Sequence, residues 1–530
     1  MRNAWKNIWT FKQAKGESIR NHSLLGVLII AGLICVGRFT NWWFHLEHVA
    51  SWPLFVLLSF LLFYGIFRMI LLWINYFNIK KNYTSDEAPP NMRVAIFTTS
   101  SPGEPLSMFE KTLEACANIS YPHTTYLLDD TQDERFKQVA EKHGAVWLEL
   151  VGLPGAKAGK INKALELTNE DFILVLDPDH IPFPNFFDHV LGFFEDEKVG
   201  FIQVSQAYYN QYRSMTAKGA AEQTYTFYGP TQMGLNGKNC AVAIGANCTF
   251  RRKALESIGG HGIGLAEDLI TSIRIHAAGW KSIYNPVIVS RGLVPEDFGS
   301  FCKQQLKWAR GVHEVLFAEY PKLFKKLSFW QKLSYFAIGT YYLVGATTFL
   351  YMLIPFIYFW FGALPGTMPF VWFLYYSLPI LIIAALIYLY VQYWMCDGET
   401  ERGFHWRGMI LKFCCWPVYL LGFLLSLIDA DIPYIPTAKQ AVTGKITPFA
   451  KPLVAQLAIF AATVGVVLYQ RRFYTPEAAV VLTAERVWGM IFFALIPALL
   501  AIGGMYAIIQ SKNLSDEDPW DEVDVNTINK

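Results

Sequence analysis

The hydrophobic pattern of the chain divides it into three parts. Long apolar stretches lie near both ends, whereas residues 92–320 carry short β-rich runs that alternate with amphipathic helical stretches. A membrane helix needs about 20 consecutive apolar residues, and alternating strand and helix patterns are typical of a parallel α/β sheet. We therefore expect an α/β domain inserted between transmembrane helices.

The apolar stretches predict six membrane spans, at residues 24–43, 54–77, 335–360, 370–394, 453–469 and 487–509. Basic residues precede the first span, and Lys80 and Lys81 follow the second. Because positive charge favours the cytoplasmic side, we expect the amino terminus and the α/β domain to be cytoplasmic. Residues 321–332 are basic and amphipathic, which predicts a helix along the membrane interface.

Four runs predict strands in the α/β region: VAIFTTS, TTYLLDD, FILVLDPD and GFIQVS, with helices at residues 108–118 and 134–143. Three of these runs end in polar residues, which are Thr98 and Thr99, Asp129 and Asp130, and Asp177 and Asp179. The carboxyl ends of parallel strands share one edge of a sheet, and ligands bind there in α/β proteins. We expect these side chains to line one crevice.

Asp177 and Asp179 directly follow an apolar run, in FILVLDPDHIP at residues 172–182. Two carboxylates one residue apart can share a hard divalent cation with the phosphates of a nucleotide. Such triplets are also common in turns and helix caps, so the motif alone leaves a purely structural role open. No glycine-rich phosphate loop follows the first strand, and a metal with lysine or arginine is the expected phosphate binder.

Three further segments offer side chains for such a site. Lys157 lies in the glycine-spaced run GAKAGKINKAL, where it can either reach an anion or begin a solvated helix. The segment GANCTFRR at residues 245–252 predicts a tight turn into a strand, a suitable floor for an acceptor sugar. Glu267 and Asp268 begin a predicted helix, where acids also act as plain caps.

The helical segment FCKQQLKWARG, at residues 301–311, places Gln304, Lys307 and Trp308 on one face at spacings of three and four. The amide and the cation suit phosphate oxygens, and the indole offers a flat surface for the C–H face of a sugar ring. The alternative is an interface helix whose Trp and Lys lie at the lipid headgroups.

Composition narrows the class of protein. With 53% hydrophobic and 17% charged residues, the chain is part membrane protein, and its net charge of +2 gives no footprint for nucleic acid. The eight cysteines lack paired spacing and histidine partners, which favours buried free thiols over zinc sites or disulfides. The acidic segment 511–530 lacks a packed pattern, so we expect it to be disordered.

In their order along the chain, these motifs resemble the processive family 2 glycosyltransferases, and within them the catalytic subunit of bacterial cellulose synthase. The matching motifs are LDD at 128–130, KAG at 157–159, LDPDHIP at 176–182, AED at 266–268, GWKSIY at 279–284 and QQLKW at 304–308. The resemblance implies a cytoplasmic α/β domain of the GT-A fold, a UDP-sugar donor, a growing polysaccharide chain as acceptor, and a divalent cation, Mg²⁺ or Mn²⁺.

The resemblance also implies roles for the donor-side residues. Asp129 would contact the uridine, and Asp177 and Asp179 would hold the diphosphate through the metal. Lys157 would lie on the phosphates. We add Thr99, at the end of the first strand, to the nucleotide-binding set.

On the acceptor side, the resemblance implies that Asp268 is the general base that takes the proton from the acceptor hydroxyl, with Glu267 beside the acceptor. Gln304, Lys307 and Trp308 would bind pyrophosphate and the acceptor end. The family usually has Arg where this chain has Lys307, so a bidentate fork becomes a point charge there.

The segment YIPTAK at residues 434–439 resembles the gating loop of cellulose synthases, which implies that Thr437 and Lys439 lie near the diphosphate. A loop over the nucleotide site has to be cytoplasmic. Residues 407–428 are apolar enough to cross the membrane, but the loop stays inside only if they lie along the interface, which we expect. Both termini are then cytoplasmic, in a multi-pass protein of the inner (plasma) membrane.

We expect an enzyme, a UDP-sugar-dependent β-glycosyltransferase that inverts configuration, polymerises glucose from UDP-glucose into a β-glucan and moves the chain across the membrane. A β-1,4 linkage is favoured, with β-1,3 or mixed linkage as alternatives. Other interpretations are a non-processive family 2 transferase that adds one sugar to a polyprenyl phosphate, and a polytopic transporter. The aromatic residues of the spans at 335–360 and 370–394 suit a channel lining or ordinary packing.

Expected partners are the donor, the growing chain, membrane lipid and accessory export subunits, and no nucleic acid. The expected domains are residues 1–91 with two spans, the glycosyltransferase domain at 92–320, the helical region at 321–510 with the gating loop at 429–450, and the tail at 511–530.

Overall fold

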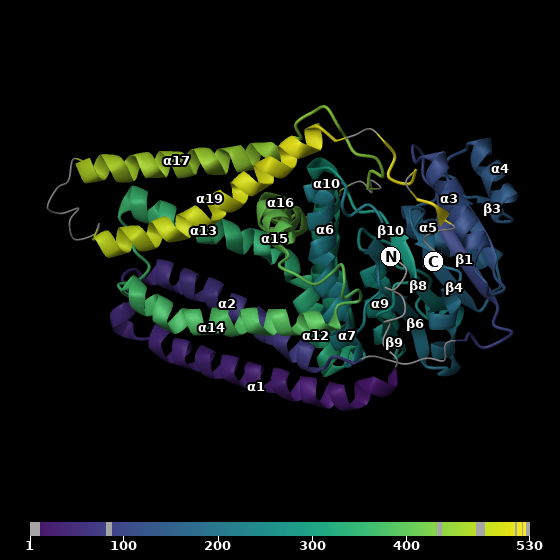
Figure 1. Ribbon diagram of the computed structural model, residues 1–530, viewed down its shortest axis with the longest axis horizontal. Coiled ribbons are helices and arrows are strands. Elements are labelled where there is room, and N and C mark those ends of the chain that lie inside the picture. Colours follow the sequence, from purple (N-terminus) through teal and green to yellow (C-terminus); the bar gives the residue numbers. More distant parts are fainter. Residues whose placement is uncertain are drawn as a thin grey trace.

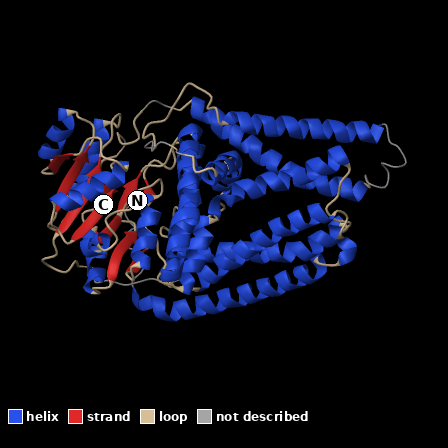
Figure 2. Ribbon diagram, turned by 180° about the vertical axis from the view of Figure 1, so that it is seen from behind, coloured by secondary structure: helices blue, strands red, loops and turns tan. Residues whose placement is uncertain are grey.

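The computed structural model describes residues 11–80, 87–430, 432, 437–472, 483–514, 517–521 and 523–525. Figure 1 shows two halves: a β-sheet with short helices lies at one end, and long helices run along each other at the other end. Seen from behind in Figure 2, the strands are confined to the first half. Helices α6 (Met215–Thr226) and α10 (Phe298–Glu314) stand between the halves, across the direction of the long helices (Figure 1).

The main sheet has seven strands in the order β3-β2-β1-β4-β8-β6-β9. Strands β3, β2, β1 and β4 are parallel, but β8 runs antiparallel to both of its neighbours. The expectation of a parallel sheet is therefore corrected to a mixed one, because the chain makes a helical excursion after β6 and re-enters the sheet at the same edge at which β6 leaves it. The strands are β1 (Val94–Thr99), β2 (Thr124–Asp129), β3 (Val146–Glu149), β4 (Phe172–Leu176), β6 (Val199–Val204), β8 (Cys248–Arg251) and β9 (Lys281–Asn285).

Helices cover both faces of this sheet. Successive side chains of a strand point to opposite faces, so Ile96 packs in one core and Phe97 in the other. The covering helices are α3 (Leu106–Ala117) and α4 (Glu134–Lys142) on one side, and α5 (Ala156–Leu167), α8 (Arg252–Glu256) and α9 (Glu267–Ala277) on the other. A second, small sheet has the order β5-β10-β7, formed by β5 (Ile181–Pro182), β7 (Ala207–Tyr208) and β10 (Ser290–Gly292).

Six stretches of the described chain are long and apolar enough to cross a membrane, at the six predicted places. They are α1 (Phe11–Trp43), α2 (Trp52–Phe77), α12 (Phe329–Gly339) continued by α13 (Val344–Phe361), α14 (Phe370–Val391), α17 (Ala450–Arg472) and α19 (Ala484–Lys512). Shorter helices are α7 (Gln232–Asn236) and α11 (Tyr320–Leu323). Many apolar side chains on the long helices point outward, as lipid-facing surfaces require.

Residues 407–428 fall in a bent pair of helices, α15 (Trp406–Cys414) and α16 (Trp416–Leu427), which meet at 46° and would make a seventh candidate span if they are counted as one. Figures 1 and 2 show α16 almost end-on, whereas the six long helices lie in the plane of the view. A helix that lies across the spans favours the predicted placement along the interface.

The expectation of a disordered tail is wrong for residues 517–521 and 523–525. Trp520 is fully buried against the α/β half, and Val523 and Val525 are buried beside Ile181. The prediction rested on the acidic composition of the tail and did not take these three apolar residues into account. The prediction of free thiols is confirmed, because all eight cysteines are unpaired and six of them are buried.

Candidate active site

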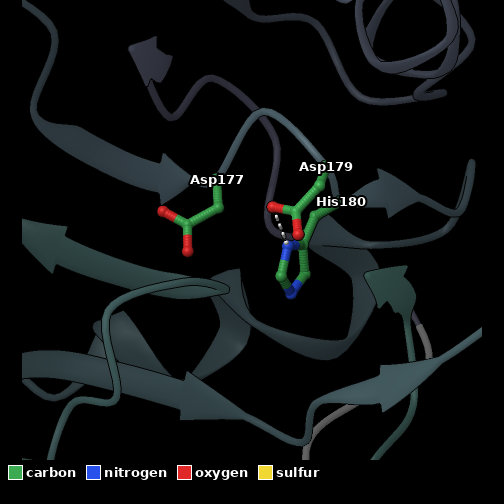
Figure 3. Close-up of side chains that lie close together, drawn as sticks. All are labelled: Asp177, Asp179 and His180. Carbon is green, nitrogen blue, oxygen red and sulfur yellow. Dashed lines mark hydrogen bonds and ion pairs between the residues drawn. The ribbon is translucent and has the colours of Figure 1, made fainter. Parts of the chain in front are cut away.

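The loop that leaves β4 carries two acids and a histidine. Ligand atoms of Asp177, Asp179 and His180 all lie within 4.8 Å of one another. Figure 3 shows the Asp179 carboxylate beside the His180 ring, with 3.3 Å between Asp179 Oδ1 and His180 Nδ1. The hydroxyl of Thr112, on α3, donates to the carbonyl of Pro178 at 2.6 Å and fixes the loop between the two acids.

His180 can occupy this position because its neighbour has no side chain. A Cβ on Gly292, in β10, would overlap the imidazole ring. His180 is buried, and its Nε2 has no hydrogen-bond partner among the described residues. Two carboxylates and an imidazole with an uncommitted nitrogen are a donor set that fits a divalent cation such as Mn²⁺ or Mg²⁺.

Each acid of the loop has a lysine partner. The ammonium of Lys157 lies 2.5 Å from Asp177 Oδ1 and also donates to the carbonyl of Gly245. The ammonium of Lys439 lies 3.1 Å from Asp179 Oδ1. Burial alone would raise the pKa of each carboxyl, but the facing ammonium outweighs it and holds the pKa below its usual range.

Lys157 reaches Asp177 because of the backbone that precedes it. Gly155, which caps α5, has φ 87°, in the left-handed region that favours glycine. A Cβ on Gly159 would overlap the carbonyl of Pro154, so the first turn of α5 can pass close to that loop only with glycine there. The glycine-spaced run therefore places a buried lysine, and the alternative of a solvated helix start is wrong.

Asp268 lies in the first turn of α9, next to Glu267. The amide N–H of Leu269 donates to Asp268 Oδ1 at 2.8 Å, and Gly245 lies across from Oδ2. Removal from water and the charge of Glu267 raise the pKa of Asp268 to about 7. The cap position of α9 is Ala266, so a plain capping role does not account for Asp268. A carboxylate with such a pKa is suited to general base catalysis near neutral pH.

Lys307, on α10, faces the same acids. It interacts electrostatically with Glu267 and Asp177, and burial lowers its pKa. Gln304 is partly buried on the same helix, and the Trp308 side chain is 37% exposed, so an indole face is open at the edge of the site. The roles of these residues toward pyrophosphate and acceptor stay predictions.

Asp129 lies at the carboxyl end of β2, as expected, but it is fully buried. Its oxygens accept hydrogen bonds from the hydroxyls of Ser100 and Thr131 and from the indole of Trp147. Asp130 is more open and lies 3.7 Å from Lys160. A contact of Asp129 with uridine stays a prediction, since protein donors engage its oxygens in this structure. Thr99 is buried at the end of β1.

Three side chains near the acids were missed by sequence reasoning: Glu104, Lys160 and His180. Glu104 interacts electrostatically with Lys439, Asp179 and Lys160, and burial raises its pKa to about 7. His180 directly follows the second acid, and Lys160 is one turn after Lys157. The closeness of His180 and Lys160 to predicted site residues in the sequence was the one available signal. Their residue types alone did not distinguish them from ordinary loop and helix residues.

The segment that resembles a gating loop lies only partly within the described residues, since residues 433–436 fall outside them. Thr437 and Lys439 are described, and both are partly buried. The contact of Lys439 with Asp179 brings this segment to the α/β half, as the prediction requires.

Comparison with known proteins agrees with this geometry. The profile of the glycosyl transferase family group 2 matches residues 172–395, which contain Asp177, Asp179, Asp268 and Lys307. Residues 172–395 therefore resemble a family 2 glycosyltransferase domain. The predicted combination of an α/β domain with long apolar helices is confirmed, with a mixed sheet in the α/β domain.

The glycosyltransferase domain resembles that of bacterial cellulose synthases. The chain is 30% identical over 263 residues to the UDP-forming cellulose synthase catalytic subunit of Komagataeibacter sucrofermentans, which covers 48% of this chain and 35% of the relative. It is 24% identical over 442 residues to the corresponding subunit of Pseudomonas fluorescens, which covers 81% of this chain and 58% of the relative. The chain therefore spans only part of the length of these curated relatives.

Among solved structures, the mannosyltransferase PcManGT from Pyrobaculum calidifontis, in complex with GDP-Man and Mn²⁺, aligns with a TM-score of 0.48 at 18% identity. The alignment covers 71% of this chain and all of that one.

Proposed function

We propose that this protein is a membrane-embedded, processive, inverting glycosyltransferase that polymerises glucose from UDP-glucose into a β-glucan and moves the product across the plasma membrane. One observation supports this above all. Asp177 and Asp179 of one loop converge on a single site with Lys157, Asp268 and Lys439, which lie far apart along the chain. The catalytic domain and both termini are cytoplasmic in this proposal.

The donor would bind at the loop after β4. Asp177 and Asp179, with His180 beside them, would hold a divalent cation, which supplies charge neutralisation for the leaving diphosphate when it is bound. Lys157 and Lys439 border the same space, and their ammonium groups would bind the phosphate oxygens.

The acceptor would lie between Gly245 and α9. Asp268 takes the proton from the acceptor hydroxyl, the hydroxyl oxygen bonds to the anomeric carbon, and the bond from that carbon to UDP breaks. Because attack and departure are in line, configuration inverts and an α-linked donor gives a β-linked product. The 37% exposed indole of Trp308 offers a surface for the sugar ring at the chain end.

In this proposal a path for the product would start near Asp268. Tyr342, just before α13, lies close enough to Asp268 to interact with it electrostatically. The next turns of α13 contribute Thr348 and Tyr351 to a cavity of about 380 Å³ between the long helices. Its aromatic lining suits sugar rings, whose C–H faces pack against such side chains. The lining residues include Trp43, Tyr351, Phe370, Phe373, Trp416 and Phe493.

The same cavity favours a second candidate function. Its lining is mostly apolar, and Gln456, one of its few polar side chains, is hydrogen-bonded to Trp416 and to the carbonyl of Pro497. An isoprenoid tail would fit such a space. A transferase that adds one sugar to a polyprenyl phosphate is therefore the alternative.

The test uses purified protein in detergent with Mg²⁺ or Mn²⁺ and each of several UDP-sugars. We expect UDP release with UDP-glucose and a long product that β-1,4-specific hydrolases digest. Digestion only by β-1,3-specific hydrolases would leave the enzyme class intact but replace the linkage. A product with a single sugar on a lipid would establish the alternative, and absence of UDP release with every donor would overturn both.

A further inference from the structure

Residues 517–521 and 523–525, here called the C-terminal strap, are anchored on α3. Trp520 is fully buried, and it packs in a cluster with Phe109 of α3 and Leu127 of β2. Its indole N–H donates to the hydroxyl of Ser107 at 2.9 Å. In Figure 1 the strap is the yellow chain that passes from the end of α19 to the α/β half. A buried tryptophan with a satisfied N–H is a strong anchor.

A second anchor lies beside the acidic loop. Val523 and Val525 are buried in a cluster with Ile181, which is two residues after Asp179. The ammonium of Lys111, on α3, donates to the carbonyl of Val523 at 3.1 Å. Since Thr112 of the same helix holds the carbonyl of Pro178, the strap and the acidic loop are fixed to one element.

The strap also holds the segment that contains Lys439. The side-chain amide of Gln440 donates to Asp518 Oδ1 at 2.7 Å. Two further hydrogen bonds position the same segment, from the amide of Val442 to Asp297 and from the amide of Gly444 to the carbonyl of Lys512. Residues 437–446 form no helix or strand, so these outer contacts, and not a backbone ladder, determine where Lys439 lies.

We propose that the C-terminal strap is a positioning element for the donor site: Trp520 fixes the strap to the domain, and Asp518, through Gln440, holds Lys439 against Asp179. The inference rests on the proposed function for its consequence, which is a lower KM for the UDP-sugar. Asp518 and Trp520 themselves touch no reacting group. They are positioning residues, and their loss acts through Lys439.

The variants come in matched pairs. Asp518→Ala removes the acceptor of the Gln440 hydrogen bond, whereas Asp518→Asn keeps an oxygen at Oδ1 and should behave as the unsubstituted protein. Trp520→Ala removes the anchor, and Asp521→Ala, at an exposed strap position, is its control. If Trp520→Ala fails to fold, the Asp518 pair still decides, because that side chain lies at the surface end of the strap.

The first measurement needs no nucleotide. An amine-acylating reagent labels accessible lysines, and mass spectrometry compares the labelling of Lys439 with that of Lys198, which is exposed. We expect about fivefold faster labelling of Lys439 in Asp518→Ala and Trp520→Ala, the factor that corresponds to one lost hydrogen bond. Equal labelling of Lys439 in all four variants overturns the proposal.

The second measurement is the split between KM and kcat. Asp518→Ala should raise KM for UDP-glucose about fivefold and leave kcat within about twofold, while Asp518→Asn restores KM. Faster labelling with an unchanged KM overturns the role at the donor site. If the unsubstituted protein consumes no UDP-sugar, the proposed function fails, and the labelling result still decides whether the strap positions Lys439.

Discussion

The two lysines that partner the acidic loop come from different halves of the molecule. Lys157 belongs to α5, the element that directly precedes β4 and Asp177, whereas Lys439 belongs to the segment between α16 and α17. The α/β half by itself therefore brings Asp177 and its ammonium partner together. The other acid obtains its partner only when the helical half is in place, which makes the donor site a property of the whole chain.

The halves also differ in the surroundings that they give to a buried acid. Asp268 in the α/β half and Glu401 in the loop between α14 and α15 both have raised pKa values, about 7 and about 8, chiefly because of burial. Glu401 accepts hydrogen bonds from the backbone amides of Cys396 and Asp397, and these bonds hold the loop between α14 and α15 together. A raised pKa is thus no sufficient mark of catalysis, and the neighbouring groups distinguish the two acids.

The largest expected effect separates these two acids. Asp268→Asn should lower kcat for UDP release about 10²- to 10⁴-fold, because a general base contributes that much. Glu401→Gln keeps its hydrogen-bond acceptor and should leave kcat unchanged. Rates of UDP release with purified protein measure both, and a comparable loss in the two variants would contradict a special role for Asp268.

The next effect concerns the acidic loop. Asp179→Ala should raise the Mn²⁺ concentration needed for half-maximal activity at least about tenfold, since a proposed ligand of the cation is removed. Asp171→Asn is the control, as Asp171 lies just before the same strand, at its opposite end, and pairs with Arg93 at the surface. Direct Mn²⁺ binding by electron paramagnetic resonance should weaken in parallel, and unchanged binding would exclude Asp179 as a ligand.

The third effect concerns pH: below the pKa of Asp268, kcat/KM should change about tenfold per pH unit. The carboxylate of Asp268 accepts a proton only when ionised, and its pKa is raised to about 7. The value of kcat/KM should therefore rise with pH below about 7 and level off above it. Steady-state kinetics from about pH 5.5 to about pH 8.5 measure the profile. A flat profile over this range would remove the basis for the assignment.

The smallest expected effect compares the two lysines. Lys157→Met leaves Asp177 without its internal partner and should destabilise the domain by about 2 kcal/mol as well as raise KM. Lys439→Met also removes the ammonium beside a buried acid, but Asp179 keeps His180 Nδ1 at 3.3 Å, so this variant should raise KM about fivefold with a smaller loss of stability than Lys157→Met. Thermal unfolding in detergent with kinetics of each variant measures this, and equal destabilisation would contradict the division between the halves.

Much of this architecture was predictable from the sequence. The six apolar stretches and the main strands were found at their places, because hydrophobic periodicity is a local property of the chain. The direction of β8 was not predictable, since it depends on a long excursion through the helices between β6 and β8. The tail was misjudged because its charges outnumber its three apolar anchors.

What the sequence by itself determined is which residue types stand at the strand ends: acids after β2 and β4, a lysine framed by glycines, and an acid pair at the start of α9. Only the tertiary structure decided that Asp129 is enclosed by protein donors, that His180 joins the acids, and that Lys439 reaches Asp179. The physical reason is that a local pattern determines the secondary structure of a segment. The burial, the ion-pair partners and the pKa shifts of its side chains are set by groups that the fold brings from elsewhere in the chain.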